Sequence, residues 1–142
     1  MSRTTGDVYS DEAGRMKPDI KLRWCAALRS GRYEQLVGQP FLARVRDDGV
    51  VMWNALGVLC DVMSFKCEPK KHGALTVLTY DGADSYLTPR NAARCGIGPK
   101  RGAFVARIYI DHTVFTQGYD IKNLSSAGVK FEQIANIIEE QL

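Results

Sequence analysis

The clearest hydrophobic pattern lies at the C-terminus, over residues 130–142. Apolar side chains recur there at helical spacing, at Phe131, Ile134, Ala135, Ile138 and Leu142. A shorter pattern of the same kind covers residues 121–127, and Gly128 separates the two. Residues three and four apart share one face of a helix, so we predict two amphipathic helices at this end of the chain.

A third helical pattern begins near the N-terminus. Apolar residues recur there at spacings of one and two turns, at Ile20, Trp24, Ala27 and Leu28. Pro18 and Asp19 suit the first turn of a helix, and Gly31 suits the position just after its last turn. We therefore predict a helix between these signals.

Four segments have the composition of strands. Residues 41–46 and 50–53 flank the turn sequence Asp47-Asp48-Gly49 and predict a β-hairpin. Residues 74–80 are rich in β-branched side chains. In residues 103–110, alternation would place Phe104, Ala106, Ile108 and Ile110 on one face of a sheet. We therefore expect about four strands.

Shorter elements lie between these strands. Asn54 is a suitable N-cap for a helix over residues 55–63, although Gly57 leaves a strand as the competing assignment. The lysine-rich residues 66–72 show no periodicity and predict an exposed loop. Thr88 followed by proline predicts a helix over residues 88–95.

Together the elements predict an α+β fold in a single domain. The strands are joined by turns or short connections, without a clear β-α-β unit, which favours an antiparallel sheet of about four strands packed against the N- and C-terminal helices. Residues 1–16 have no periodic apolar pattern and predict a flexible polar arm. The globular domain is then expected over residues 17–142.

Composition indicates the class of protein and its expected location. The chain has 142 residues, of which 45% are hydrophobic and 25% charged, as in an ordinary globular protein. Its N-terminus lacks the apolar core of a secretory signal, and no apolar stretch reaches membrane-spanning length. We therefore expect a cytoplasmic protein without a membrane partner, in which the four cysteines are free thiols.

Metal binding and catalysis are both poorly supported by the motifs. The candidate metal ligands lack the close pairing of structural zinc sites, at Cys60, Cys67, His72 and Cys95. A nucleophilic enzyme would need His72 or His112 beside a cysteine or serine, and the phosphate-loop and dinucleotide-binding motifs are missing. We predict neither a metal nor another cofactor.

Nucleic-acid or nucleotide binding is a stronger alternative. The formal charge is +3, which decides nothing by itself. Basic side chains gather near two predicted helices, and the candidate contacts are Arg29, Arg32, Arg90, Arg94, Lys100 and Arg101. Tyr33 offers a stacking surface beside them. The same charges also fit the polar rim of a protein-binding surface.

Three segments carry a resemblance to a known group. They are WCAALRSGRYEQ at residues 24–35, LGVLCDV at residues 56–62 and FEQIANIIEEQL at residues 131–142. They resemble small uncharacterised proteins of actinobacterial phages and prophages, which carry ALRSG-x-Y-x-Q, LGVLCD and F-x-x-IA-x-x-IE. That group has paired cysteines before LGVLCD, whereas this chain has Met52, Trp53, Asn54 and Ala55.

The resemblance implies a phage accessory protein that works inside a bacterial host cell, and it implies no reaction. With no catalytic motif in view, we expect a non-enzymatic binding protein that engages a host macromolecule. A host protein is the expected partner, and homo-oligomers are compatible with this expectation. Nucleic-acid or nucleotide binding remains the alternative, and a Cys/His enzyme is a third class.

Overall fold

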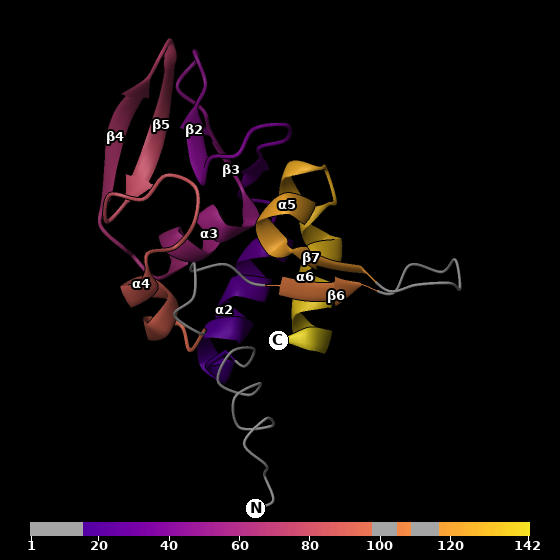
Figure 1. Cartoon of the computed structure of the whole chain (residues 1–142). Coiled ribbons are helices and arrows are strands. Elements are labelled where there is room, and N and C mark those ends of the chain that lie inside the picture. Colours follow the sequence, from indigo (N-terminus) through magenta and orange to yellow (C-terminus); the bar gives the residue numbers. More distant parts are fainter. Residues whose placement is uncertain (1–15, 98–104, 109–116) are drawn as a thin grey trace, which may run out of the picture.

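The computed structural model describes residues 16–97, 105–108 and 117–142 (Figure 1). The predicted polar arm, apart from its last residue, lies outside them. The helices are α2 (Pro18–Arg29), α3 (Ala55–Val62), α4 (Pro89–Arg94), α5 (Ile121–Ser126) and α6 (Phe131–Gln141). The strands are β1 (Glu34–Gln35), β2 (Ala43–Val45), β3 (Val51–Trp53), β4 (Cys67–His72), β5 (Leu75–Tyr80), β6 (Val105–Ile108) and β7 (Gln117–Asp120).

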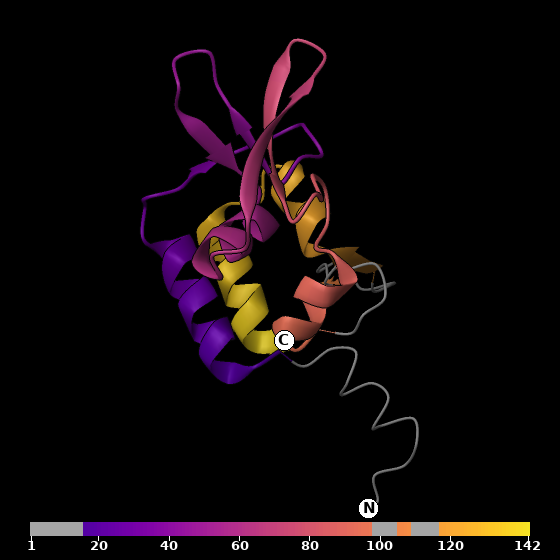
Figure 2. The ribbon, with the colours of Figure 1, turned by 90° about the vertical axis from the view of Figure 1, so that its left-hand side faces the viewer.

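Five of these strands form one sheet in the order β1-β3-β2-β5-β4. The β2–β3 and β4–β5 hairpins are antiparallel and join through the antiparallel β2–β5 pair. Their turns lie at the same end of the sheet, and both hairpins extend beyond the helices there (Figure 2). The α+β fold with helices near both ends is confirmed.

Two details of the predicted sheet are wrong. The sheet is mixed, because β1 runs parallel to β3, so that Glu34 pairs with Met52. The strand predicted over residues 103–110 is described only at Val105–Ile108, and it pairs with β7 in a separate two-stranded sheet. A two-residue strand such as β1 has no periodicity that a sequence pattern can reveal.

The helices build the main core on one side of the five-stranded sheet. Helix α2 packs against α6 and α3, and Trp24 lies fully buried where they meet. Its indole Nε1 donates a hydrogen bond to the Ala55 carbonyl at 2.9 Å, which satisfies the buried polar group. Met16, assigned to the arm by the sequence pattern, is 3% exposed and belongs to this core.

Segment 66–72, predicted to be an exposed loop, is instead mostly strand β4. All six residues of Cys67–His72 are exposed on both faces, which is why no alternation marks the strand. Pro69 lacks an N–H and fits only where that group would point away from β5, at the free edge of the sheet. The lysines and the proline protect this edge from pairing with another strand.

The remaining local predictions agree with the structure. The first hairpin closes with Arg46 N–H donating to the Val50 carbonyl at 2.8 Å, and Gly49 adopts a φ of +90°. The predicted helices at residues 55–63 and 88–95 form as α3 and α4. Within the described residues, none of the helices combines the length and hydropathy of a membrane span.

Candidate binding surface

Arg29, the first candidate for nucleic-acid contact, already forms an intramolecular ion pair. Its guanidinium donates to both carboxylate oxygens of Glu139 at 2.7 and 2.8 Å and to the Asn136 amide oxygen at 2.7 Å. This hydrogen-bonded pair lowers the pKa of Glu139 below its usual value. The geometry links α2 to α6 and leaves little of the Arg29 charge for a phosphate.

Of the other predicted basic residues, Arg32 closely follows Arg29 in the chain, whereas Arg90 and Arg94 belong to α4. Arg32 and Arg90 are exposed, and the Arg94 guanidinium lies 5.1 Å from the centre of the Phe65 ring. The end of α4 lies beside the start of α2, where Lys17 N–H donates to the Cys95 carbonyl. Arg29 occupies the opposite end of α2, about 18 Å away along a 12-residue helix. Lys100 and Arg101 lie outside the described residues.

Three of the four cysteine side chains are buried and pack inside the protein. Cys25, Cys60 and Cys95 are buried, and burial raises the pKa of Cys25 and of Cys95 to about 11. A thiol with a raised pKa carries little nucleophilic thiolate at neutral pH. Cys67 is exposed on β4.

His72 does not complete a site with these thiols. His72 lies at the far end of β4 from Cys67, about 16 Å away, with its ring against Phe41. Across the described residues, no cluster of three metal-ligating side chains occurs. His112 lies outside the described residues.

The three segments 24–35, 56–62 and 131–142 contact one another. Arg29 of the first segment binds Asn136 and Glu139 of the third. Tyr33 of the first donates to the Asp61 carboxylate of the second at 2.6 Å, and burial together with this bond raises the pKa of Tyr33 to about 12. These motif side chains therefore hold the fold together.

Further motif residues have equally structural roles. The Gln35 amide donates to the carbonyls of Ser125 and Val129 at 3.0 and 2.8 Å, at the end of α5. Gly57 lies so close to β2 that a Cβ atom there would collide with the Leu42 carbonyl group. The motif residues Gln35 and Gly57 therefore stabilise the fold, and a binding surface has to be sought among other residues.

On one face of the five-stranded sheet, a second hydrophobic cluster contains no residue of a described helix. It is built from Leu36, Phe41 and Val77 with the half-buried Met52 and Leu75. We call this side of the sheet the helix-free face. Directly paired residues point to the same side of a sheet, so one row crosses all five strands on this face: Glu34, Met52, Arg44, Val77 and Lys70.

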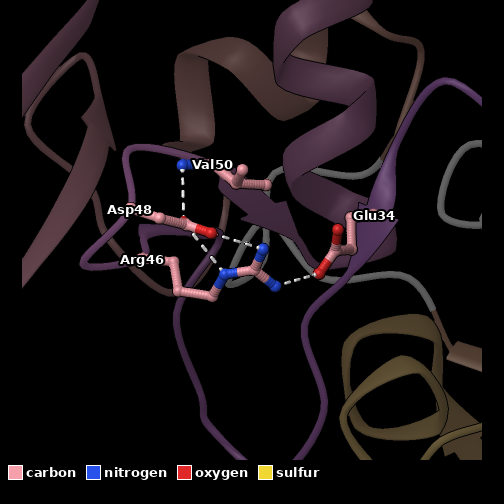
Figure 3. Close-up of polar contacts among 4 residues, drawn as sticks. All are labelled: Glu34, Arg46, Asp48 and Val50. Atoms are coloured by element: carbon pink, nitrogen blue, oxygen red, sulfur yellow. Dashed lines mark hydrogen bonds and ion pairs between the residues drawn. The ribbon is translucent and has the colours of Figure 1, made fainter.

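An ion-pair network occupies one side of the helix-free face. Arg46 binds Asp48 through Nε and Nη2 at 3.0 and 2.8 Å and binds Glu34 through Nη1 at 2.6 Å (Figure 3). Asp48 also accepts from Val50 N–H at 3.1 Å. Chiefly through the Arg46 hydrogen bond, the pKa of Asp48 falls to about 2. The Arg46 charge is thus balanced within the hairpin and β1.

Arg44, in the middle of the row, has a different environment. Its Nη1 donates a long hydrogen bond of 3.3 Å to the Gln39 amide oxygen, and its Nε is buried without a hydrogen-bond partner. Within the described residues it forms no ion pair with a carboxylate. Lys70 at the end of the row lies 3.5 Å from Asp84.

The sequence pattern did not single out Arg44. Residues 41–46 were predicted as a strand, but a polar residue between Ala43 and Val45 is expected on any half-exposed strand. Its special position depends on β2 being the central strand and on its pairing with Met52 and Val77. Strand order and register are long-range properties, which local alternation does not contain.

Comparison with known proteins gives a family but no activity. Neither the curated proteins nor the solved structures compared with this chain include a match. One family model matches residues 16–142, which cover the whole described domain. The chain therefore belongs to the family described as domain of unknown function DUF8296.

Proposed function

We propose that this protein is a phage-type accessory protein that acts in the cytoplasm of the host cell as a non-enzymatic binding protein. Its partner is a host macromolecule, and a protein fits best. The observation that carries this proposal is the helix-free face, which combines the half-buried Met52 and Leu75 with the cation of Arg44. The resemblance in three segments supports the phage setting.

The composition of the face favours a protein partner. Protein interfaces combine an apolar centre with a polar rim, and arginine is enriched in them. The helix-free face has an apolar centre, a guanidinium without a carboxylate and a rim that includes Lys70, His72 and Glu34. A second copy of the chain is compatible with such a surface, so a homo-oligomer remains part of the proposal.

Nucleic-acid or nucleotide binding is the second candidate. This candidate is favoured by exposed basic residues in β4 and just before it, at Lys66, Lys70 and Lys71. Against it, Arg29 already binds a carboxylate, and the other predicted cations lie at different ends of α2. A Cys/His enzyme has less support, because the described buried thiols have raised pKa values.

The test is affinity capture from an actinobacterial host lysate with the full chain as bait. Parallel samples are treated with nuclease or left untreated, and the bound material is analysed by mass spectrometry at physiological salt. We expect one protein that saturates the bait and survives nuclease. Recovery of nucleic acid alone would contradict a protein partner, because phosphate contacts rather than the apolar centre would then supply the affinity.

A further inference from the structure

Arg44 holds the central position of the helix-free face. Strand β2 is the middle strand of the sheet, and Arg44 is the middle residue of that strand. Its side chain lies between Met52 of β3 and Val77 of β5, and Val77 is fully buried. A cation in this position has apolar neighbours on both sides, where electrostatic interactions are stronger than in water.

Among the described residues, the other arginine and lysine side chains of the helix-free face already have carboxylate partners. Arg46 binds Asp48 and Glu34, and Lys70 lies within 3.5 Å of Asp84. In the part of the chain that the structure describes, the one hydrogen-bond acceptor for the Arg44 side chain is the amide oxygen of Gln39, and that bond uses Nη1. The Arg44 Nε is buried, so the donors left for a partner are the remaining Nη hydrogens, and a guanidinium binds a carboxylate well because the pairing is charge-assisted.

The surroundings of Arg44 define the chemistry of its partner further. Met52 and Leu75 are half-buried on this face, and Met52 is directly paired with Arg44, so the face offers apolar contact next to the cation. Toward β4 the row ends in the exposed Lys70, whose ammonium group contacts Asp84 at 3.5 Å and has further donors for a negatively charged group. A segment with acidic side chains next to apolar ones matches this surface in both respects.

We propose that the helix-free face binds an acidic segment of a partner protein, with Arg44 as the anchor for a carboxylate of that segment. The proposal rests on the proposed function, because it takes the partner to be a protein. The segment lies across the face and does not extend the sheet as an added strand, because Pro69 and the lysines obstruct pairing at the β4 edge.

The experiment selects binders from a displayed library of random 12-residue peptides on the immobilised full chain. Selected peptides are then measured by fluorescence anisotropy against the wild type, Arg44→Gln and Arg90→Gln. Arg90 is the matched control because it is an exposed arginine on α4, with no hydrogen bond or ion pair among the described residues. Circular dichroism verifies that each variant is folded.

We expect the selected peptides to be enriched in aspartate and glutamate beside apolar residues. Arg44→Gln should weaken their binding at least about tenfold, since a hydrogen bond between charged groups contributes about 1.5–3 kcal/mol. Arg90→Gln should leave affinity within about twofold. If Arg44→Gln does not fold, Lys70→Gln provides the second variant and should weaken the same peptides, because Lys70 lies in the same row.

Three results would overturn the proposal: no enrichment in acidic residues, equal binding to the Arg44 variant, or Arg44-dependent binding of a 12-nucleotide deoxythymidine strand without peptide binding. Lysate capture by the same variants separates this proposal from the proposed function. A captured protein that binds wild type and Arg44→Gln equally would leave the binding function standing and refute the role of Arg44.

Discussion

Gly57 sets how closely α3 approaches the sheet. A Cβ atom at this position would collide with the Leu42 carbonyl oxygen and lie 2.8 Å from its carbonyl carbon. Alanine normally favours a helix over glycine by about 1 kcal/mol, but here backbone would have to move. We predict that Gly57→Ala lowers the free energy of unfolding by about 3 kcal/mol.

Urea unfolding followed by circular dichroism measures this effect. The reverse change at an exposed helical position, Ala26→Gly on α2, is the control and should cost only about 1 kcal/mol from helix propensity. A Gly57→Ala protein as stable as the wild type would show that α3 and Leu42 are not in such close contact.

The Cys95 thiol predicts how stability changes in alkaline solution. Burial raises its pKa from 9.0 to about 11, so between these pH values the folded state retains a proton that the unfolded chain releases. Stability from this group is therefore complete below pH 9 and is lost as pH rises toward 11. In the presence of reductant, the urea midpoint should fall between pH 8 and 10.5, and less steeply in Cys95→Ala. Equal slopes in the two proteins would contradict this assignment.

At the residue scale, sequence patterns found side chains but not their partners. Arg29 was a predicted nucleic-acid contact, yet it binds Glu139, which lies 110 positions later in the chain. The pairing of Tyr33 with Asp61 was equally invisible in the sequence pattern. Such pairs depend on how the helices pack against one another. A single sequence therefore supplies candidate binding residues, but it does not show which of their charges are already paired within the protein.

Helix α3 begins at a buried cap that also connects it to α5. The Asn54 side chain accepts from Leu56 N–H at 3.0 Å and donates to the Lys122 carbonyl at 3.0 Å. We predict that Asn54→Ala lowers the free energy of unfolding by about 2–3 kcal/mol, because it removes a cap and leaves the Lys122 carbonyl without this partner.

Thr88 of α4 provides the matched comparison. Among the described residues its hydroxyl accepts only from Asn91 N–H, at 3.1 Å, so Thr88→Ala should cost about 1 kcal/mol. Urea unfolding of both variants measures the difference. Equal costs would mean that the connection between Asn54 and α5 contributes nothing to stability.

Helices α2 and α6 are joined at their surface by Arg29. A double-mutant cycle with Arg29→Ala and Glu139→Ala should give a favourable coupling energy that decreases in 1 M salt, because both side chains remain partly exposed. The coupling should also weaken in acid, since Arg29 lowers the pKa of Glu139 and its stabilising effect is lost as the carboxylate becomes protonated. Additive effects of the two changes would show that the pair does not link the helices.

At the element scale, helices with a periodic apolar face were predictable from sequence, as α2 and α6 demonstrate. Strand β4 was not, because all of its residues are exposed and no face is distinguished. Strand β1 has only two residues and forms through its parallel pairing with β3. An element whose residues are exposed, or which is very short, derives its structure from its neighbours.

For the whole molecule, the α+β class and the helices at both ends followed from local patterns, whereas the sheet order did not. The candidate surface exists only because that order places Arg44 at the centre of a face whose hydrophobic cluster contains no residue of a described helix. Local patterns predicted the strand that carries Arg44 and could not predict its two neighbours across the sheet.

The most direct test of a protein-binding helix-free face is amide chemical-shift mapping by NMR. The isotopically labelled full chain is titrated with the protein captured from the host lysate. The account predicts shifts concentrated along the row that contains Met52, Arg44, Val77 and Lys70, with little change on α2 and α4. Shifts confined to the surroundings of Arg29, Arg32, Arg90 and Arg94 would contradict it.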